Sequence, residues 1–187
     1  MIKNAYDADA DWVKVSFVDF GYDEKKNDIF VQEDSKIIVE DNGSGMDLKT
    51  IEDSWMNPAT PNKRTDDGEK PLITPIKKRI IQGEKGIGRF AILKLGRKIE
   101  ITTRPDKSSV EYFIDYDLSQ YDDDFLTQNG KKKKLYIDNL EIPVSDREPQ
   151  AIINREVVVN SIKFKSNNHH GTRIEISNLK GEWSLYL

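Results

Sequence analysis

The chain reads DNGSGM at residues 41–46, directly after an apolar run that ends at Glu40. Two glycines in such a turn permit positive φ angles and a close approach of the backbone to a ligand. Asp41 stands at the end of the apolar run, where its carboxylate can accept a hydrogen bond from an exocyclic amine such as that of adenine. The alternatives are an ordinary Asn-Gly turn and a calcium loop. Calcium is disfavoured because Gly45 falls on a position where such a loop needs a side-chain ligand.

The residues on either side of this turn divide into elements by their periodicity. Alternating apolar and polar residues predict strands, whereas apolar residues at helical spacing predict helices. Asp47 is expected to cap the helix that follows the turn. Helices are expected at residues 2–10, 47–56 and 87–95, and strands at 12–20, 29–33, 36–40 (a hairpin with 29–33), 97–104, 109–116, 134–142, 156–164 and 172–178. This order predicts an α/β two-layer sandwich with a mixed, largely antiparallel sheet and helices on one face.

Residues 57–82 interrupt the pattern. They are mostly polar, are punctuated by prolines and hold no sustained period. A segment of this length inside a compact domain is typical of a functional lid or of a disordered stretch. The chain contains no internal repeat and no interdomain linker, so residues 1–187 are expected to form a single domain.

The composition limits the classes of function. The net charge is -4, from 29 basic and 33 acidic residues, which argues against a free-standing nucleic-acid-binding domain because such domains are usually basic. No apolar run reaches the roughly 20 residues that span a membrane, and the absence of cysteine excludes disulfides and thiolate metal sites. We therefore expect a cytoplasmic protein. His169 and His170 are expected in a surface turn, since no third histidine exists to complete a metal site with them.

Two further segments carry groups suited to a phosphate ligand. Asn4 and Asp7 are three residues apart and hence on the same side of a helix, and an amide oxygen can hold magnesium beside phosphates. The sequence GEKGIGRFA at residues 83–91 places glycines before a helix, whose first N–H groups attract an anion. Lys85 and Arg89 can add charge-assisted hydrogen bonds to phosphate oxygens. Taken separately, the first pair is better explained as two polar residues on an exposed helix face, and the second segment is neither a Walker A motif nor a Rossmann fingerprint.

Taken together and in this order, the three segments resemble the N-box and the two glycine boxes of the GHKL superfamily. That superfamily groups the ATP-binding domains of gyrase, heat-shock chaperones, histidine kinases and MutL. Gly171-Thr172 is a fourth match, at the start of a strand where the family keeps a threonine near the adenine. The resemblance implies the Bergerat ATP-binding fold, and the segments are more similar to the chaperone and MutL side than to the histidine kinases.

The resemblance implies a role for each matched residue. Asn4 would coordinate Mg²⁺ that bridges the phosphates of ATP, with Asp7 supporting the site from behind. Asp41 would accept the adenine amine, supported by Gly45 and Thr172. The full set of expected ATP contacts is Asn4, Asp7, Ala8, Asp41, Gly43, Gly45, Met46, Gly83, Lys85, Gly86, Ile87, Gly88, Arg89, Phe90 and Thr172.

One feature of the family is missing from the sequence. The family's general base is a glutamate four residues before the N-box asparagine, and counting back from Asn4 passes beyond Met1. We therefore expect a domain that is truncated at its N-terminus and at its C-terminus and that has no catalytic residue of its own. It is expected to bind Mg-ATP and hydrolyse it slowly, with residues 57–82 closing as a lid and driving a conformational change. Further domains of a longer chain and a homodimer partner are expected, and a membrane is not. The alternatives are a nucleotide-binding switch without hydrolysis and a catalytic domain of the histidine-kinase type.

Overall fold

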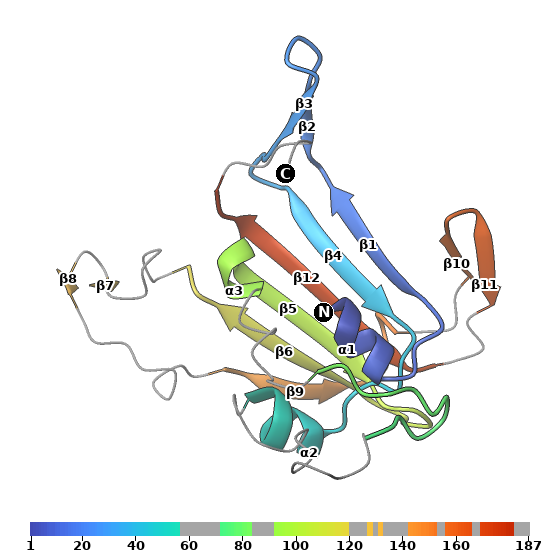
Figure 1. The fold of residues 1–187 in the computed structure, drawn as a ribbon. Coiled ribbons are helices and arrows are strands. Elements are labelled where there is room, and N and C mark those ends of the chain that lie inside the picture. Colours follow the sequence, from blue (N-terminus) through green and yellow to red (C-terminus); the bar gives the residue numbers. More distant parts are fainter. Residues whose placement is uncertain are drawn as a thin grey trace.

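A computed structural model describes residues 1–56, 72–83, 92–119, 127–128, 131–132, 142–152, 156–165 and 169–181. At its centre is a six-stranded sheet with the strand order β1-β4-β12-β5-β6-β9 (Figure 1). Every pair of neighbours in this sheet is antiparallel. Its strands are β1 (Val13–Val18), β4 (Lys36–Asp41), β12 (Gly171–Leu179), β5 (Gly96–Arg104), β6 (Glu111–Asp117) and β9 (Val144–Arg147).

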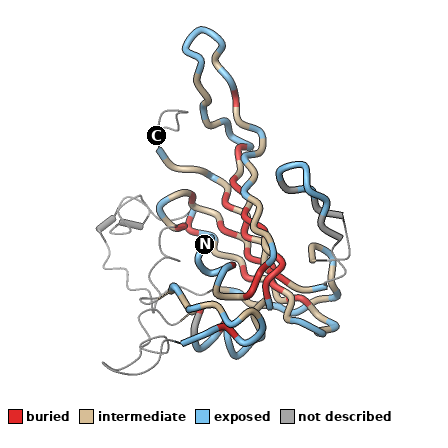
Figure 2. Tube along the Cα trace, turned by 45° about the vertical axis from the view of Figure 1, so that its right-hand side comes forward, coloured by how far each residue is buried: buried red, intermediate tan, exposed pale blue. Residues whose placement is uncertain are grey.

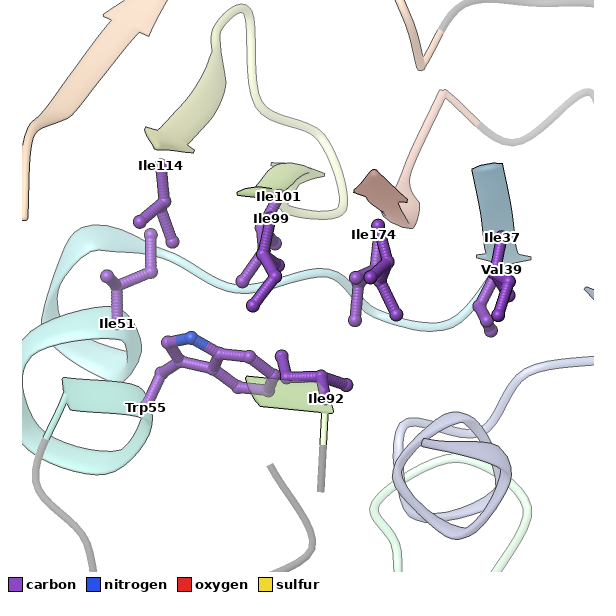
Figure 3. Close-up of a cluster of buried hydrophobic side chains, with 10 residues drawn as sticks. Ile37, Val39, Ile51, Trp55, Ile92, Ile99, Ile101, Ile114 and Ile174 are labelled. Carbon is purple, nitrogen blue, oxygen red and sulfur yellow. The ribbon is translucent and has the colours of Figure 1, made fainter. Parts of the chain in front are cut away.

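The described helices are short and lie on one face of the sheet (Figure 3). Asp47 caps α2, because its side chain accepts a hydrogen bond from the N–H of Thr50 at 2.7 Å, as the sequence predicts. Among the described residues, none of the helices has the length and hydrophobicity of a transmembrane segment. The helices are α1 (Ile2–Asp7), α2 (Leu48–Thr50), the π-helical turn η1 (Ile51–Met56) that continues it, and α3 (Ile92–Leu95).

A layer made mostly of isoleucines joins η1 and α3 to the sheet (Figure 3). Ile99 and Ile101 of β5 and Ile114 of β6 are fully buried, as is Ile51 of η1. Residues two apart in a strand point to the same face, so the alternation in β5 and β12 collects the isoleucines of these strands in one layer. Figure 2 shows the buried residues gathered along the central strands. The predicted α/β two-layer sandwich is confirmed.

The opposite face of the sheet is charged. Arg173 of β12 donates hydrogen bonds to Glu40 at 3.1 Å and to Glu175 at 2.9 Å. Lys36 of β4 donates to Glu175 at 2.7 Å. These side chains alternate with the apolar ones along the same strands, so the sheet has one apolar and one polar face, as antiparallel sheets commonly do.

The first part of the chain forms a different hairpin from the predicted one. β2 (Gly21–Asp23) pairs with β3 (Asp28–Phe30), whereas β4 pairs with β1 and β12. The predicted hairpin between residues 29–33 and 36–40 is therefore wrong. The alternation identified the strand at β4, but the pairing partner depends on residues far along the chain, which local patterns do not contain.

Other differences concern the second half of the chain. β10 (Glu156–Val159) and β11 (Ile162–Lys165) form a hairpin where a single strand was predicted, because Asn160 and Ser161 take positive φ angles of 49° and 65° that suit a two-residue turn. β9 was not predicted. The strand predicted at 134–142 lies outside the described residues except for Ile142. The remaining short pair is β7 (Thr127–Gln128) with β8 (Lys131–Lys132).

Candidate functional site

Asp41 is the last residue of β4, and it lies opposite Val13 of β1 and Thr172 of β12. Its Oδ1 accepts a hydrogen bond from the N–H of Gly43 at 2.9 Å. Burial raises the pKa of Asp41 to about 6, although hydrogen bonds from the backbone of Gly43 and Thr172 act in the opposite direction. The end of β4 thus holds a carboxyl group that titrates closer to neutral pH than an exposed aspartate does.

The glycine turn that follows Asp41 packs directly on the end of α1. Ser44 donates its N–H to the carbonyl oxygen of Ala8 at 2.8 Å. A Cβ on Gly43 would lie 2.6 Å from the Cβ of Ala8, so only glycine permits this contact. Ala8 and Gly43 therefore join the helix that carries Asn4 to the turn that carries Asp41, and two of the predicted segments meet.

Two threonine hydroxyls lie beside the same turn. Thr103 of β5 is fully buried, and its Oγ1 accepts a hydrogen bond from the N–H of Met46 at 2.8 Å. The same Oγ1 lies 3.1 Å from Oγ1 of Thr172 and 3.2 Å from the carbonyl oxygen of Gly171. Thr103 therefore links Met46 and Thr172, two of the expected ATP contacts. Thr103 was missed, because a threonine in a strand is ordinarily a strand-forming residue.

Asn42 and His170 hold the turn from its other side. Oδ1 of Asn42 accepts hydrogen bonds from the N–H groups of Asp11 at 2.8 Å and Trp12 at 3.1 Å, which ties the turn to the start of β1. Nδ1 of His170 lies 2.5 Å from the carbonyl oxygen of Gly43. His169 is exposed as expected, but the His170 side chain is only 17% exposed.

Within the described residues, no group of three His, Asp or Glu side chains is placed to hold a metal ion.

The other end of the site is formed by α1 and the segment 72–83. Asp7 accepts hydrogen bonds from the N–H of Gln82 at 2.8 Å and of Gly83 at 3.0 Å, one on each carboxylate oxygen. Asn4 lies one turn earlier on α1 and is exposed. An exposed amide oxygen in this position fits Mg²⁺, which commonly takes one or two protein ligands and fills its other positions with phosphate oxygens and water.

Most of the site residues described above lie in the part of the chain that matches a known family. The family model described as "Histidine kinase-, DNA gyrase B-, and HSP90-like ATPase" matches residues 1–142, which include Asn4, Asp7, Asp41 and Gly45. The chain belongs to this ATPase family. A search of the curated proteins found no match.

Membership of this ATPase family confirms the predicted GHKL relationship, and the six-stranded antiparallel sheet with helices on one face agrees with it. Thr172 lies beyond the matched range, yet the pairing of β12 with β4 puts it beside Asp41. Residues 57–71 of the predicted lid lie outside the described residues. So do six of the predicted ATP contacts, which are Lys85, Gly86, Ile87, Gly88, Arg89 and Phe90.

Proposed function

We propose that this chain binds ATP, with the adenine at Asp41 and the triphosphate beside α1. The observation that carries the proposal is the position of the Asp41 carboxyl group at the end of β4, next to the hydroxyl groups of Thr103 and Thr172. A carboxylate there accepts a hydrogen bond from the exocyclic amine of adenine, and hydroxyl groups can bond to the ring nitrogens directly or through water. Guanine would present a carbonyl oxygen to the carboxylate, so this arrangement favours adenine.

At the phosphate end, Asn4 is the residue of α1 that would hold Mg²⁺. When bound, the ion would neutralise part of the triphosphate charge. Asp7 acts indirectly, because both of its carboxylate oxygens are bonded to the backbone of Gln82 and Gly83. It thereby keeps the first residue of the glycine-rich segment close to the helix that carries Asn4. Lys85 and Arg89, with the glycines between them, are proposed as phosphate contacts from the family resemblance.

We further propose that efficient hydrolysis of the bound ATP depends on a general-base glutamate, as expected for this ATPase family. The resemblance puts the general base four residues before Asn4, and a positioned general base contributes about 10²–10⁴-fold to a rate. We also propose that residues 57–82 close over the nucleotide and that this closure passes a conformational change to a larger protein. The chain is further proposed to pair with a homodimer partner. Within that segment, residues 72–82 are bonded to α1 and the turn that ends it, which would give a lid a fixed base.

The binding proposal is tested by titrating Mg-ATP into the protein and measuring heat. We expect saturable binding that Asp41→Asn abolishes and that GTP does not reproduce. Asp34→Asn is the matched control, because Asp34 is an exposed residue in the turn before β4 and its substitution leaves binding unchanged. A protein that is folded by circular dichroism but does not bind ATP contradicts the proposal, and so does an Asp41→Asn variant that binds as tightly as the wild type.

The hydrolysis proposal needs a separate measurement. We expect steady-state turnover to rise when a glutamate is placed directly before Met1, which is four positions before Asn4. An added glutamine at the same place is the control, because it lengthens the chain by one residue without supplying a base. Equal turnover in the glutamate and glutamine versions contradicts the proposal.

A further inference from the structure

Helix α1 ends in a turn that normally contains glycine. The N–H of Asp9 bonds to the carbonyl oxygen of Tyr6 at 3.1 Å, and the N–H of Ala10 bonds to that of Ala5 at 3.0 Å. This pair of bonds is the Schellman motif, whose turning residue is usually glycine because it takes a positive φ angle. Here the turning residue is Asp9, with φ of 59°, and its side chain is buried.

The carboxylate of Asp9 is surrounded by donors from one short turn. Its Oδ2 accepts the N–H of Ile76 at 2.9 Å, and its Oδ1 accepts the N–H of Lys77 at 3.2 Å. The hydroxyl group of Thr74, which is fully buried, donates to the same Oδ1. Burial opposes the ionised form of Asp9, but these hydrogen bonds outweigh it and hold the pKa of Asp9 below its ordinary value. An ionised carboxylate with three donors makes a strong attachment.

The turn held by Asp9 is the tip of a small hairpin that returns to α1. Ile73 and Ile80 form a β-bridge, and the N–H of Ile81 bonds to the carbonyl oxygen of Leu72 at 2.9 Å. Figure 1 shows this segment in green beside α1. The hairpin delivers Gln82 and Gly83 to the carboxylate of Asp7.

Basic side chains of the hairpin fasten it to the end of the same helix. Arg79 donates to the carbonyl oxygen of Ala10 at 3.0 Å, and its guanidinium lies 4.8 Å from the centre of the Tyr6 ring. Lys77 forms an ion pair with Asp11 at 2.5 Å. Of the contacts between the hairpin and α1, those made by Asp9 are the most buried. They are therefore expected to contribute the most to the rigidity of the hairpin.

We propose that Asp9 is a positioning residue for the triphosphate, because it fixes residues 74–77 on the end of α1 and thereby sets Gly83 against Asp7. The inference rests on the proposed ATP binding. Gly83 is the first residue of the glycine-rich segment, so its position determines where that segment starts relative to Asn4. A glycine at position 9 would satisfy the helix end equally well but would leave the donors of the 74–77 turn without their acceptor.

The test uses Asp9→Gly, which suits the positive φ angle and removes only the carboxylate. We expect the amide hydrogens of Gln82 and Gly83 to exchange at least about tenfold faster, although their acceptor, Asp7, is unchanged. We expect the affinity for Mg-ATP to fall by about tenfold, while the affinity for adenosine stays within about twofold, since the adenine end does not depend on this turn. Asp9→Asn keeps one acceptor oxygen and is expected to show a smaller loss of ATP affinity.

Asp19→Gly is the matched control, because Asp19 is an exposed aspartate with a similar φ of 56°; it is expected to leave both affinities unchanged. If Asp9→Gly does not fold, Thr74→Val removes one of the donors to the Asp9 carboxylate. Amide exchange and the affinities for Mg-ATP and adenosine are then measured on that variant. An unchanged ratio of ATP to adenosine affinity in a folded variant overturns the inference and leaves the proposed function standing. A wild-type protein that binds neither ligand overturns both.

Discussion

Gly45 faces the carbonyl oxygen of Arg104 so closely that a Cβ on Gly45 would lie 2.0 Å from that oxygen. Gly45 also has a positive φ of 67°. We expect Gly45→Ala to lower the free energy of unfolding by about 2 kcal/mol or more, because it combines backbone strain of about 1 kcal/mol with overpacking. Urea denaturation measures the change.

The control for this prediction is Gly181→Ala. Gly181 has a φ of 79°, but apart from its chain neighbours no atom of the described residues lies within 4 Å of the position that a Cβ would take there, so only the strain is expected. Equal losses of stability in the two variants contradict the argument that the contact with β5 requires a glycine at position 45.

Thr103→Val removes a buried hydroxyl group without changing the shape of the side chain much. The N–H of Met46 loses its acceptor, and an unsatisfied buried donor costs about 1–3 kcal/mol. We expect a loss of stability in that range and weaker ATP binding, because Thr172 loses a partner next to Asp41. Thr103→Ser keeps the hydroxyl group and is expected to retain ATP affinity. Equal affinities in the valine and serine variants contradict the prediction.

The stability of the protein is expected to depend on pH through Asp41. Folding raises its pKa from 3.8 to about 6, so the native state binds this proton more tightly than the unfolded state does. The contribution of Asp41 to the free energy of unfolding therefore rises as the pH falls from about 6 toward 3.8, by up to about 1.4 kcal/mol per pH unit. Denaturation of the wild type and of Asp41→Asn at several pH values isolates this residue, and a difference that is constant with pH contradicts the prediction.

Glu111 is expected to be a strong structural anchor outside the site. Its side chain is fully buried, and it accepts hydrogen bonds from Arg147 at 2.8 Å and from the N–H of Ile152 at 3.0 Å. Glu111→Gln should lower the free energy of unfolding by about 3 kcal/mol, because it leaves the charge of Arg147 without its partner. Thermal unfolding checks this, with Glu148→Gln as the control at an exposed glutamate nearby.

The pH dependence of Glu111 has the opposite sign to that of Asp41. Burial alone would raise its pKa, but the hydrogen bonds from Ile152 and Arg147 outweigh burial and hold the pKa of Glu111 below 4.5. Its contribution to stability is therefore complete above the ordinary pKa of 4.5 and is lost as the pH falls through the lowered pKa. Glu111→Gln should lie closest to the wild type in stability at the most acid pH. A gap between the two proteins that widens with acid contradicts this assignment.

Local sequence was sufficient for the elements whose boundaries depend on nearby residues. The cap at Asp47, the strand at β5 and the strand at β12 were all predicted, because caps and alternation are properties of a few consecutive residues. The predicted helix at 2–10 was too long at its end, since Asp9 takes a positive φ angle that a helical pattern does not reveal. The hairpin partner of β4 was predicted wrongly for a related reason: two adjacent strands in the sequence need not be neighbours in a sheet.

The sequence by itself determined the family and supplied the candidate groups of the proposed site, because the spacing of Asn4, Asp41 and the glycines is a property of the chain. The tertiary structure alone decided which side chains support them. Thr103 reaches Met46, and Asp9 reaches Ile76, only because strand pairing and the hairpin at 72–83 bring residues 57 and 67 positions apart into hydrogen-bonding distance. Buried polar groups must find partners wherever the fold provides them, and no local pattern specifies where that is.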